Sequence, residues 1–189
     1  MTGIPVFYLV SIPVHVPLPI GRRLSHPEKR ILKMDKNRLP PCLIFIDKEG
    51  RWYHRGAEMI HREFIRLFYE NMEMDATGRY IITMGDDRCY VEVEDTPYVV
   101  RSVRFKDPGE DDKACFQLIL SDDSHERLSP DTLYVGKEQV LYCRVKDRAF
   151  PARFSRPAYY QLAEYITEDE GSYFLPLKGK KYVIRREGT

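Results

Sequence analysis

The sequence has few of the spacings that indicate a specific chemistry. Its four cysteines, Cys42, Cys89, Cys115 and Cys143, form no C-x-x-C pair and have no H-x-x-x-H companion. Zinc sites and dithiol redox motifs use such close spacings, so neither is indicated. We therefore expect four free thiols in a reducing cytoplasm, and no metal or cofactor.

Residues 1–21 contain no Lys, Arg, Asp or Glu, and four prolines interrupt them. A membrane-spanning helix needs about 20 uninterrupted apolar residues, and a signal peptide has a basic start and an A-x-A cleavage site. We expect an extended arm instead. A further hypothesis is that the native chain starts at Met34, because coherent patterning begins only near Leu39. The intact mass of the native protein tests this hypothesis, because a mass that includes residues 1–33 would contradict it.

Charge is unevenly distributed, although the formal net charge is +1. Residues 22–38 hold seven Lys or Arg and two acidic residues, which leaves −4 for the chain from residue 39 onward. This balance argues against a nucleic-acid-binding body. The basic arm can reach RNA, DNA or anionic lipid, but it lacks interleaved aromatic residues, so we favour a solvated arm.

Apolar spacing predicts the elements of the first half. CLIFID (42–47) and RWYHR (51–55) indicate two strands around a turn. A helix is predicted from residue 58 to about 74, because apolar residues recur there at helical spacing: Ile60, Phe64, Leu67, Phe68 and Met72. A hairpin around GDD (85–87) follows, and then strands over 98–105 and 114–120.

The second half follows the same order, with strands at TLYVG and QVLYCRV, a helix over about 156–167 and a closing hairpin. Ser155 is a candidate N-cap with Pro157 in the first turn, and the expected buried stripe is Tyr159, Leu162, Tyr165 and Ile166. Pro176 cannot donate a ladder hydrogen bond, so its strand is predicted to be an edge strand. Such an edge can accept an extended peptide, but we favour a proline that blunts it.

The sequence contains one long internal repeat. GRYIITMGDDRCYVEVE (78–94) returns as GSYFLPLKGKKYVIRRE (171–187), with matching positions 93 residues apart. We therefore predict an α+β fold of two repeated β/α units, each an antiparallel sheet packed with one main helix. The expected organisation is an arm over 1–38, a first unit over 39–121 and a second unit over 122–189. Two such small units should share an interface.

Four stretches together carry a family resemblance: GRWYHRGAEMIHREFIRLF (50–68), YVEVEDTPYVV (90–100), FSRPAYYQLAEY (154–165) and SYFLPL (172–177). In combination they resemble a bacterial family, domain of unknown function 1285. The resemblance implies two β/α repeats, an uncharacterised activity and a suspected role in signalling. It supplies no catalytic residues.

The sequence offers one candidate nucleophile and one candidate metal site, and each set of residues also has a purely structural interpretation. A nucleophile pair of His54 with Cys42, Cys89 or Cys143 is conceivable, but His54 shares a strand face with Trp52, which indicates core. A metal cluster is also conceivable, but the D-x-D-x-D-G pattern is absent, so we favour solvated turns. The residues considered for it are Asp86, Asp87, Asp122, Asp123 and His125.

Paired arginines are the candidate ligand-binding residues. Arg55 matches Arg144 in the second unit, and Arg62 matches Arg156. Across a shared interface these guanidinium groups could line a groove for phosphate or carboxylate. The alternative is ordinary salt bridges, for instance to Glu58, Glu63 or Glu164, and we favour it.

The sequence thus predicts a cytoplasmic, non-catalytic binding or regulatory module, and the family resemblance implies a role in signal transduction. Its partner would be a small anionic ligand or another protein, and we expect no membrane span. The alternative is a small enzyme with a polar cleft between the two units. An enzyme would enclose titratable groups with perturbed pKa values, whereas a module would offer an open groove.

Overall fold

The computed structural model describes residues 39–107 and 114–187, so the expected N-terminal arm and the Met34 hypothesis lie outside the described residues. The first sheet contains β1 (Pro41–Ile46), β2 (Trp52–His54), β3 (Ala57–Glu58), β4 (Met72–Met74), β5 (Tyr80–Met84) and β6 (Asp87–Val93), in the order β3-β2-β1-β6-β5-β4. Helix α1 (Arg62–Glu70) lies between β3 and β4 in the chain.

The second sheet contains β7 (Tyr98–Lys106), β8 (Cys115–Leu120), β9 (His125–Arg127), β10 (Tyr134–Val135), β11 (Leu141–Val145), β12 (Phe150–Phe154) and β16 (Arg185–Arg186), in the order β16-β10-β11-β12-β7-β8-β9. The third contains β13 (Thr167–Asp169), β14 (Ser172–Leu177) and β15 (Lys180–Val183). Helix α2 (Arg156–Ala163) follows β12, and two short 3₁₀ turns, η2 (Pro130–Thr132) and η3 (Lys137–Gln139), flank β10.

The expected α+β class is wrong, because the described chain is mostly β. Its helices have only nine and eight residues, against sixteen strands in three sheets. The first helix ends before Asn71, the C-cap residue, whose side-chain amide donates to the carbonyl of Leu67 at 2.8 Å. Residues 72–74, expected to be helical, pair with β5 as strand β4 instead.

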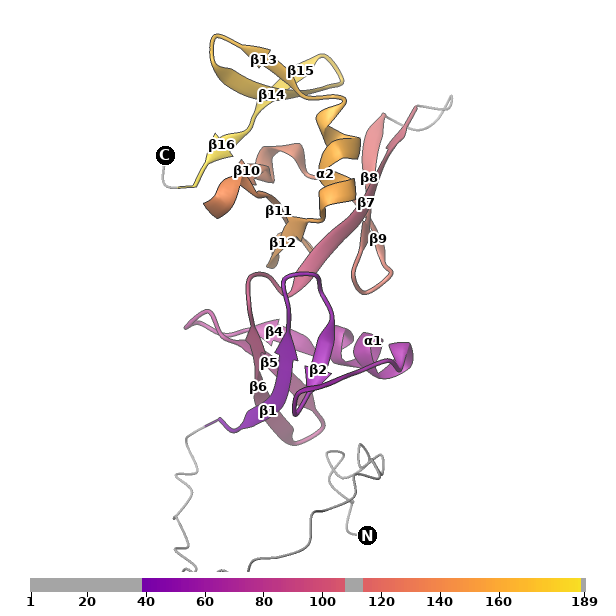
Figure 1. Cartoon of the computed structure of the whole chain (residues 1–189), viewed down its shortest axis with the longest axis vertical. Helices are drawn as coiled ribbons and strands as arrows, with labels where there is room; N and C mark the ends of the chain where they lie inside the picture. Colours follow the sequence, from indigo (N-terminus) through magenta and orange to yellow (C-terminus); the bar gives the residue numbers. More distant parts are fainter. Residues whose placement is uncertain (1–38, 108–113, 188–189) are drawn as a thin grey trace, which may run out of the picture.

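The first and second sheets lie one beyond the other along the long axis, with the third sheet at the far end (Figure 1). Helix α2 packs against β7 and β12. The expected unit boundary after residue 121 falls between β8 and β9, which pair in one sheet. The seven-stranded sheet therefore takes strands from both predicted units.

The predicted apolar stripe of the first helix is wrong for Ile60, Phe64 and Leu67, which are exposed, and right for Phe68 and Met72, which are buried. The other buried residues of α1 are Ile65 and Tyr69. Two apolar stripes run along this segment, and helical spacing alone does not decide which one meets the sheet. The cap predicted for the second helix is confirmed: Ser155 Oγ accepts a hydrogen bond from the backbone N–H of Ala158, and a proline follows in the first turn.

An aromatic chain joins the two larger sheets through one continuous core. Trp52 of β2 packs on Tyr69 of α1 with ring centroids 4.7 Å apart, and Tyr69 packs on Tyr98 of β7 at 4.7 Å. Tyr98 in turn packs on Phe150 of β12 at 5.3 Å. The hydroxyl of Tyr69 also hydrogen-bonds Ser121 Oγ at 2.8 Å. Neither sheet could separate without exposing these buried rings.

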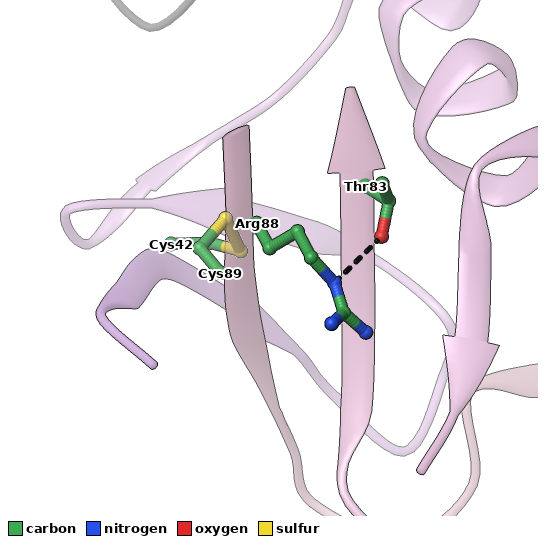
Figure 2. Close-up of a disulfide and its surroundings, with 4 residues drawn as sticks. All are labelled: Cys42, Thr83, Arg88 and Cys89. Atoms are coloured by element: carbon green, nitrogen blue, oxygen red, sulfur yellow. Dashed lines mark hydrogen bonds between the residues drawn. A yellow bond between two sulfur atoms is a disulfide. The ribbon is translucent and has the colours of Figure 1, made fainter. Parts of the chain in front are cut away.

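Cys42 and Cys89 form a disulfide between the parallel neighbours β1 and β6 (Figure 2). The expectation of four free thiols is therefore wrong for this pair, because strand pairing brings together cysteines 47 residues apart. Cys115 and Cys143 are free and buried. Structural disulfides are characteristic of oxidising compartments, so the thiols no longer support a cytoplasmic location, which stays a prediction.

Two further expectations concern the third sheet and membrane spans. Pro176 lies on β14, the central strand, so the edge-strand prediction is wrong for the strand as a whole. β13 pairs only with Ser172–Phe174, which leaves Pro176 without a neighbour on that side. Within the described ranges, no helix has the length and apolar character needed to cross a membrane.

Each α-helix is followed by a three-stranded antiparallel meander, β4-β5-β6 after α1 and β13-β14-β15 after α2. Tyr80 pairs with Val91 in the first, and the N–H of Ile184 donates to the carbonyl of Tyr173 in the second, at 2.8 Å. These positions are related by the same shift of 93 residues. Internal duplication remains a prediction, with this register in its favour.

Candidate functional site

An open cavity of about 600 Å³ lies where α1 meets the second sheet. The first sheet and its helix contribute Arg66, Tyr69, Glu70 and Met72; the second sheet contributes Tyr98, Asp122, Asp123, Ser124, Lys146 and Phe150. Its walls thus come from segments far apart in sequence. A junction of this kind is a common place for a small-molecule site.

The buried part of the cavity wall consists of apolar and aromatic side chains. Met72 and Phe150 are buried, and Tyr98 is only 2% exposed. The Tyr98 hydroxyl has no hydrogen-bond partner among the described residues. Burial, with the nearby Asp122 carboxylate, raises the pKa of Tyr98, so its hydroxyl stays neutral and can donate to a ligand.

Lys146 is held at the cavity by three acceptors. Its ammonium lies 2.7 Å from Asp122 Oδ2 and 3.1 Å from Glu126 Oε1, and it donates to Ser124 Oγ at 2.7 Å. Burial alone would lower the pKa of Lys146, but the two carboxylates outweigh it and raise the pKa. The ammonium therefore stays protonated, and its three donors are already used.

The turn that carries Lys146 is strained. Lys146, Asp147 and Arg148 all have left-handed backbones, with φ of 53°, 52° and 69°, although none is glycine. Each such residue costs roughly 1–2 kcal/mol. The turn is held by a bond from the Lys146 N–H to Glu126 Oε2 at 2.9 Å and by one from the Ala149 N–H to the Lys146 carbonyl at 2.9 Å. Strain of this kind tends to concentrate at binding sites.

Two arginines hold the β8–β9 turn, Arg62 of α1 and Arg101 of β7. Arg62 donates to the carbonyl of Ser121 at 3.1 Å and forms an ion pair with Asp123. Arg101 of β7 lies 3.2 Å from the other oxygen of Asp123. These contacts position the turn that supplies Asp122 and Ser124 to the cavity.

The four predicted arginines do not converge on this cavity. Arg62 is not among its lining residues and forms an ion pair with Asp123, so the salt-bridge interpretation holds for Arg62, with a partner that the sequence did not suggest. Arg144 lines a second open cavity of about 640 Å³ beside β9, together with Arg127 and Arg148. Arg55, in the turn after β2, and Arg156, at the start of α2, line neither of the two cavities.

Arg66, Tyr98 and Lys146 are among the cavity residues that were not site candidates from sequence. Each lies in an ordinary strand, helix or turn, and no motif marks it. A partial signal was available in YVEVEDTPYVV, the stretch quoted for the family resemblance, which contains Tyr98. Their convergence depends on how the two sheets pack.

No cysteine is among the residues that line the cavity, which argues against the nucleophile hypothesis there. Cys42 and Cys89 are bonded to each other, and burial raises the pKa of the fully buried Cys143 thiol, which disfavours the reactive thiolate. Burial also lowers the pKa of His54. In the part of the chain that the structure describes, no group of three or more His, Cys, Asp or Glu is placed to hold a metal ion.

Acid should weaken the Asp122–Lys146 contact. Burial alone would raise the pKa of Asp122, but hydrogen bonds from Lys146 and Ser124 lower it. A carboxyl with a lowered folded-state pKa stabilises the protein above the unfolded value of about 3.9, and this contribution is lost as the pH falls through the folded-state pKa. We expect Asp122→Asn to lose about 1–3 kcal/mol at pH 7. The deficit relative to the wild type should shrink toward pH 2.

Urea unfolding of both proteins from pH 7 to pH 2 measures this difference. Asp87→Asn, on β6 and away from the cavity, is the control and should track the wild type at every pH. A deficit for Asp122→Asn that stays constant across the range would contradict the assignment.

Comparison with solved structures finds two proteins of similar fold. One is a DUF1285 family protein from Silicibacter pomeroyi DSS-3, with a TM-score of 0.65 and 16% identity over 77% of this chain and 80% of that one. The other is a DUF1285 family protein from Shewanella baltica OS155, with a TM-score of 0.54 and 17% identity over 65% of this chain and 91% of that one. They support the suspected family at the level of the fold.

Two sequence comparisons find nothing comparable. No protein-family model matches the chain, and no curated protein matches it significantly. The structural neighbours carry no stated activity, so the function has to be argued from the cavity.

Proposed function

We propose that this chain is a non-catalytic binding or regulatory module of the DUF1285 type that takes a small ligand in the cavity between α1 and the second sheet. The observation that carries the proposal is Tyr98, a tyrosine in the cavity wall whose side chain is buried and whose hydroxyl has no partner among the described residues. Within the described residues, the only fully buried side-chain N or O atom without a partner is Nε1 of Trp52, so the Tyr98 hydroxyl keeps some exposure and is free to donate a hydrogen bond to a ligand in the cavity.

Arg66 favours a ligand that carries an anionic group. It lies at the cavity, is exposed, and makes no ion pair with any described residue. A free guanidinium binds carboxylate or phosphate through two parallel hydrogen bonds. The ligand would thus place its acidic group on Arg66 and its apolar part against Met72 and Phe150.

Lys146 favours binding over the enzyme alternative. A lysine acts as a base or nucleophile when its pKa is lowered, whereas here two carboxylates raise it. The cavity is also open, which suits a module that exchanges its ligand with solvent.

The test is a thermal-shift screen against nucleotides, phosphorylated metabolites, amino acids and divalent metals. A ligand at 100 times its dissociation constant adds about 2.7 kcal/mol to the stability of the folded state, which is a readable shift. For a hit, we expect Tyr98→Phe and Arg66→Ala each to weaken binding about tenfold or more. Isothermal titration calorimetry measures the dissociation constants.

Arg104→Ala is the matched control, because Arg104 is an exposed arginine of β7 that lines neither cavity. It should bind as the wild type does. A hit that binds all three variants equally would place the ligand elsewhere and overturn the proposal. Absence of any hit would favour a protein partner.

A further inference from the structure

Most charged groups at the cavity are already neutralised by the protein. Asp122 is paired with Lys146, and Asp123 is paired with Arg62 and Arg101. Two lining residues of opposite charge remain, Arg66 and Glu70 of α1, and neither makes an ion pair with a described residue. The charges that a ligand can meet are therefore one guanidinium and one carboxylate.

These two groups lie on the same face of one helix. Residues four apart on a helix have Cβ atoms about 5–6 Å from each other, so both side chains can reach adjacent groups of one small molecule. They do not pair with each other in this structure. A guanidinium suits a carboxylate, and a carboxylate accepts hydrogen bonds from an ammonium.

The charge balance of the lining points the same way. Because Asp122 is paired with Lys146 and Asp123 with Arg62 and Arg101, the charges left unpaired at the lining are one cation, Arg66, and one anion, Glu70. A purely anionic ligand would leave Glu70 without a compensating contact. A molecule that carries both an ammonium and a carboxylate would satisfy Arg66 and Glu70 together.

We propose that the ligand is a zwitterion of the α-amino-acid type with an apolar or aromatic side chain. Its carboxylate lies on Arg66, its ammonium on Glu70, and its side chain against Met72, Tyr98 and Phe150. This inference rests on the proposed function of the cavity and specifies the class of its ligand. Paired polar contacts of this kind give selectivity, because an analogue that lacks one charge leaves a protein group unpaired.

Calorimetric titration with phenylalanine, leucine, tyrosine and tryptophan tests the class on the full chain. Two analogues of the best binder each lack one charge: the amide has no carboxylate, and the N-acetyl derivative has no ammonium. We expect each analogue to bind about 10- to 100-fold more weakly, as each loses a charge-assisted contact. Inorganic phosphate is the probe for a simple anion site.

Variants assign each charge to its residue. Arg66→Met should remove the preference for the free carboxylate, and Glu70→Gln the preference for the free ammonium. Glu63→Gln, also an exposed acidic residue of α1 but absent from the cavity lining, is the matched control and should bind as the wild type does. Circular dichroism and thermal midpoints confirm that each variant is folded.

The outcomes separate this inference from the proposed function. If phosphate or another simple anion binds in dependence on Arg66 and Tyr98 but not on Glu70, the cavity is a binding site and the zwitterion class is wrong. If the amide and N-acetyl derivatives bind as tightly as the parent amino acid, the inference is likewise overturned. If no amino acid binds while another hit depends on Tyr98, the proposed function stands without it.

Discussion

Replacing Cys42 and Cys89 together by serine should lower the free energy of unfolding by about 4 kcal/mol. The disulfide closes a loop of 47 residues, and the loss of loop-closure entropy in the unfolded chain grows with loop length to about this value. Since small domains are stable by only about 5–15 kcal/mol, this is a large fraction of the total.

Urea unfolding with and without dithiothreitol measures the effect of the disulfide. The reductant should destabilise the wild type by a similar amount and leave the double serine variant unchanged. Cys115 and Cys143 are free, so a further loss in the variant would come from another source. A wild type that is insensitive to complete reduction would contradict the prediction.

Replacing Trp52 by alanine should cost about 3–5 kcal/mol, the range for a fully buried aromatic residue. Trp52 is 1% exposed, stacks on Phe68 with centroids 6.0 Å apart and meets Tyr69 edge-on at 4.7 Å. Tyr69 also lines the cavity and contacts Tyr98. We therefore expect the substitution to weaken ligand binding as well as stability.

Phe64→Ala is the matched control for Trp52→Ala. Phe64 belongs to the stripe that helical spacing predicted to be buried, yet it is 44% exposed. Its truncation should cost less than about 1 kcal/mol in chemical denaturation. If Phe64→Ala lost as much stability as Trp52→Ala, Phe64 would be buried, and α1 would pack through the face predicted from helical spacing.

Local elements were predictable because their signals are local. The hairpin of β5 and β6 and the strands β7 and β8 lie where alternating apolar residues and turn residues indicated them. The Ser155 cap was predictable for the same reason, since an N-cap acts within three residues.

Helix lengths and the helix face were not predictable in this way. The expected first helix extended over residues 71–74, but β5 offers Met72–Met74 a strand partner, and pairing with it overrides helical spacing. The buried face of α1 is the one whose Tyr69 packs on Trp52 of β2 and Tyr98 of β7. These two strands precede and follow the helix in the chain. A sequence window that covers only the helix contains neither of them.

The sequence by itself determined where most strands lie, where α2 begins and which family the chain resembles, because those features depend on neighbouring residues. The tertiary structure alone decided the disulfide, the partners of Arg62 and the cavity. Cys42 meets Cys89 because β1 pairs with β6, and Arg62 meets Asp123 because α1 packs beside the β8–β9 turn. Tyr98 and Lys146, 48 positions apart, converge because β12 pairs with β7. Contacts of this kind are set by strand order and sheet packing, which local spacing does not encode.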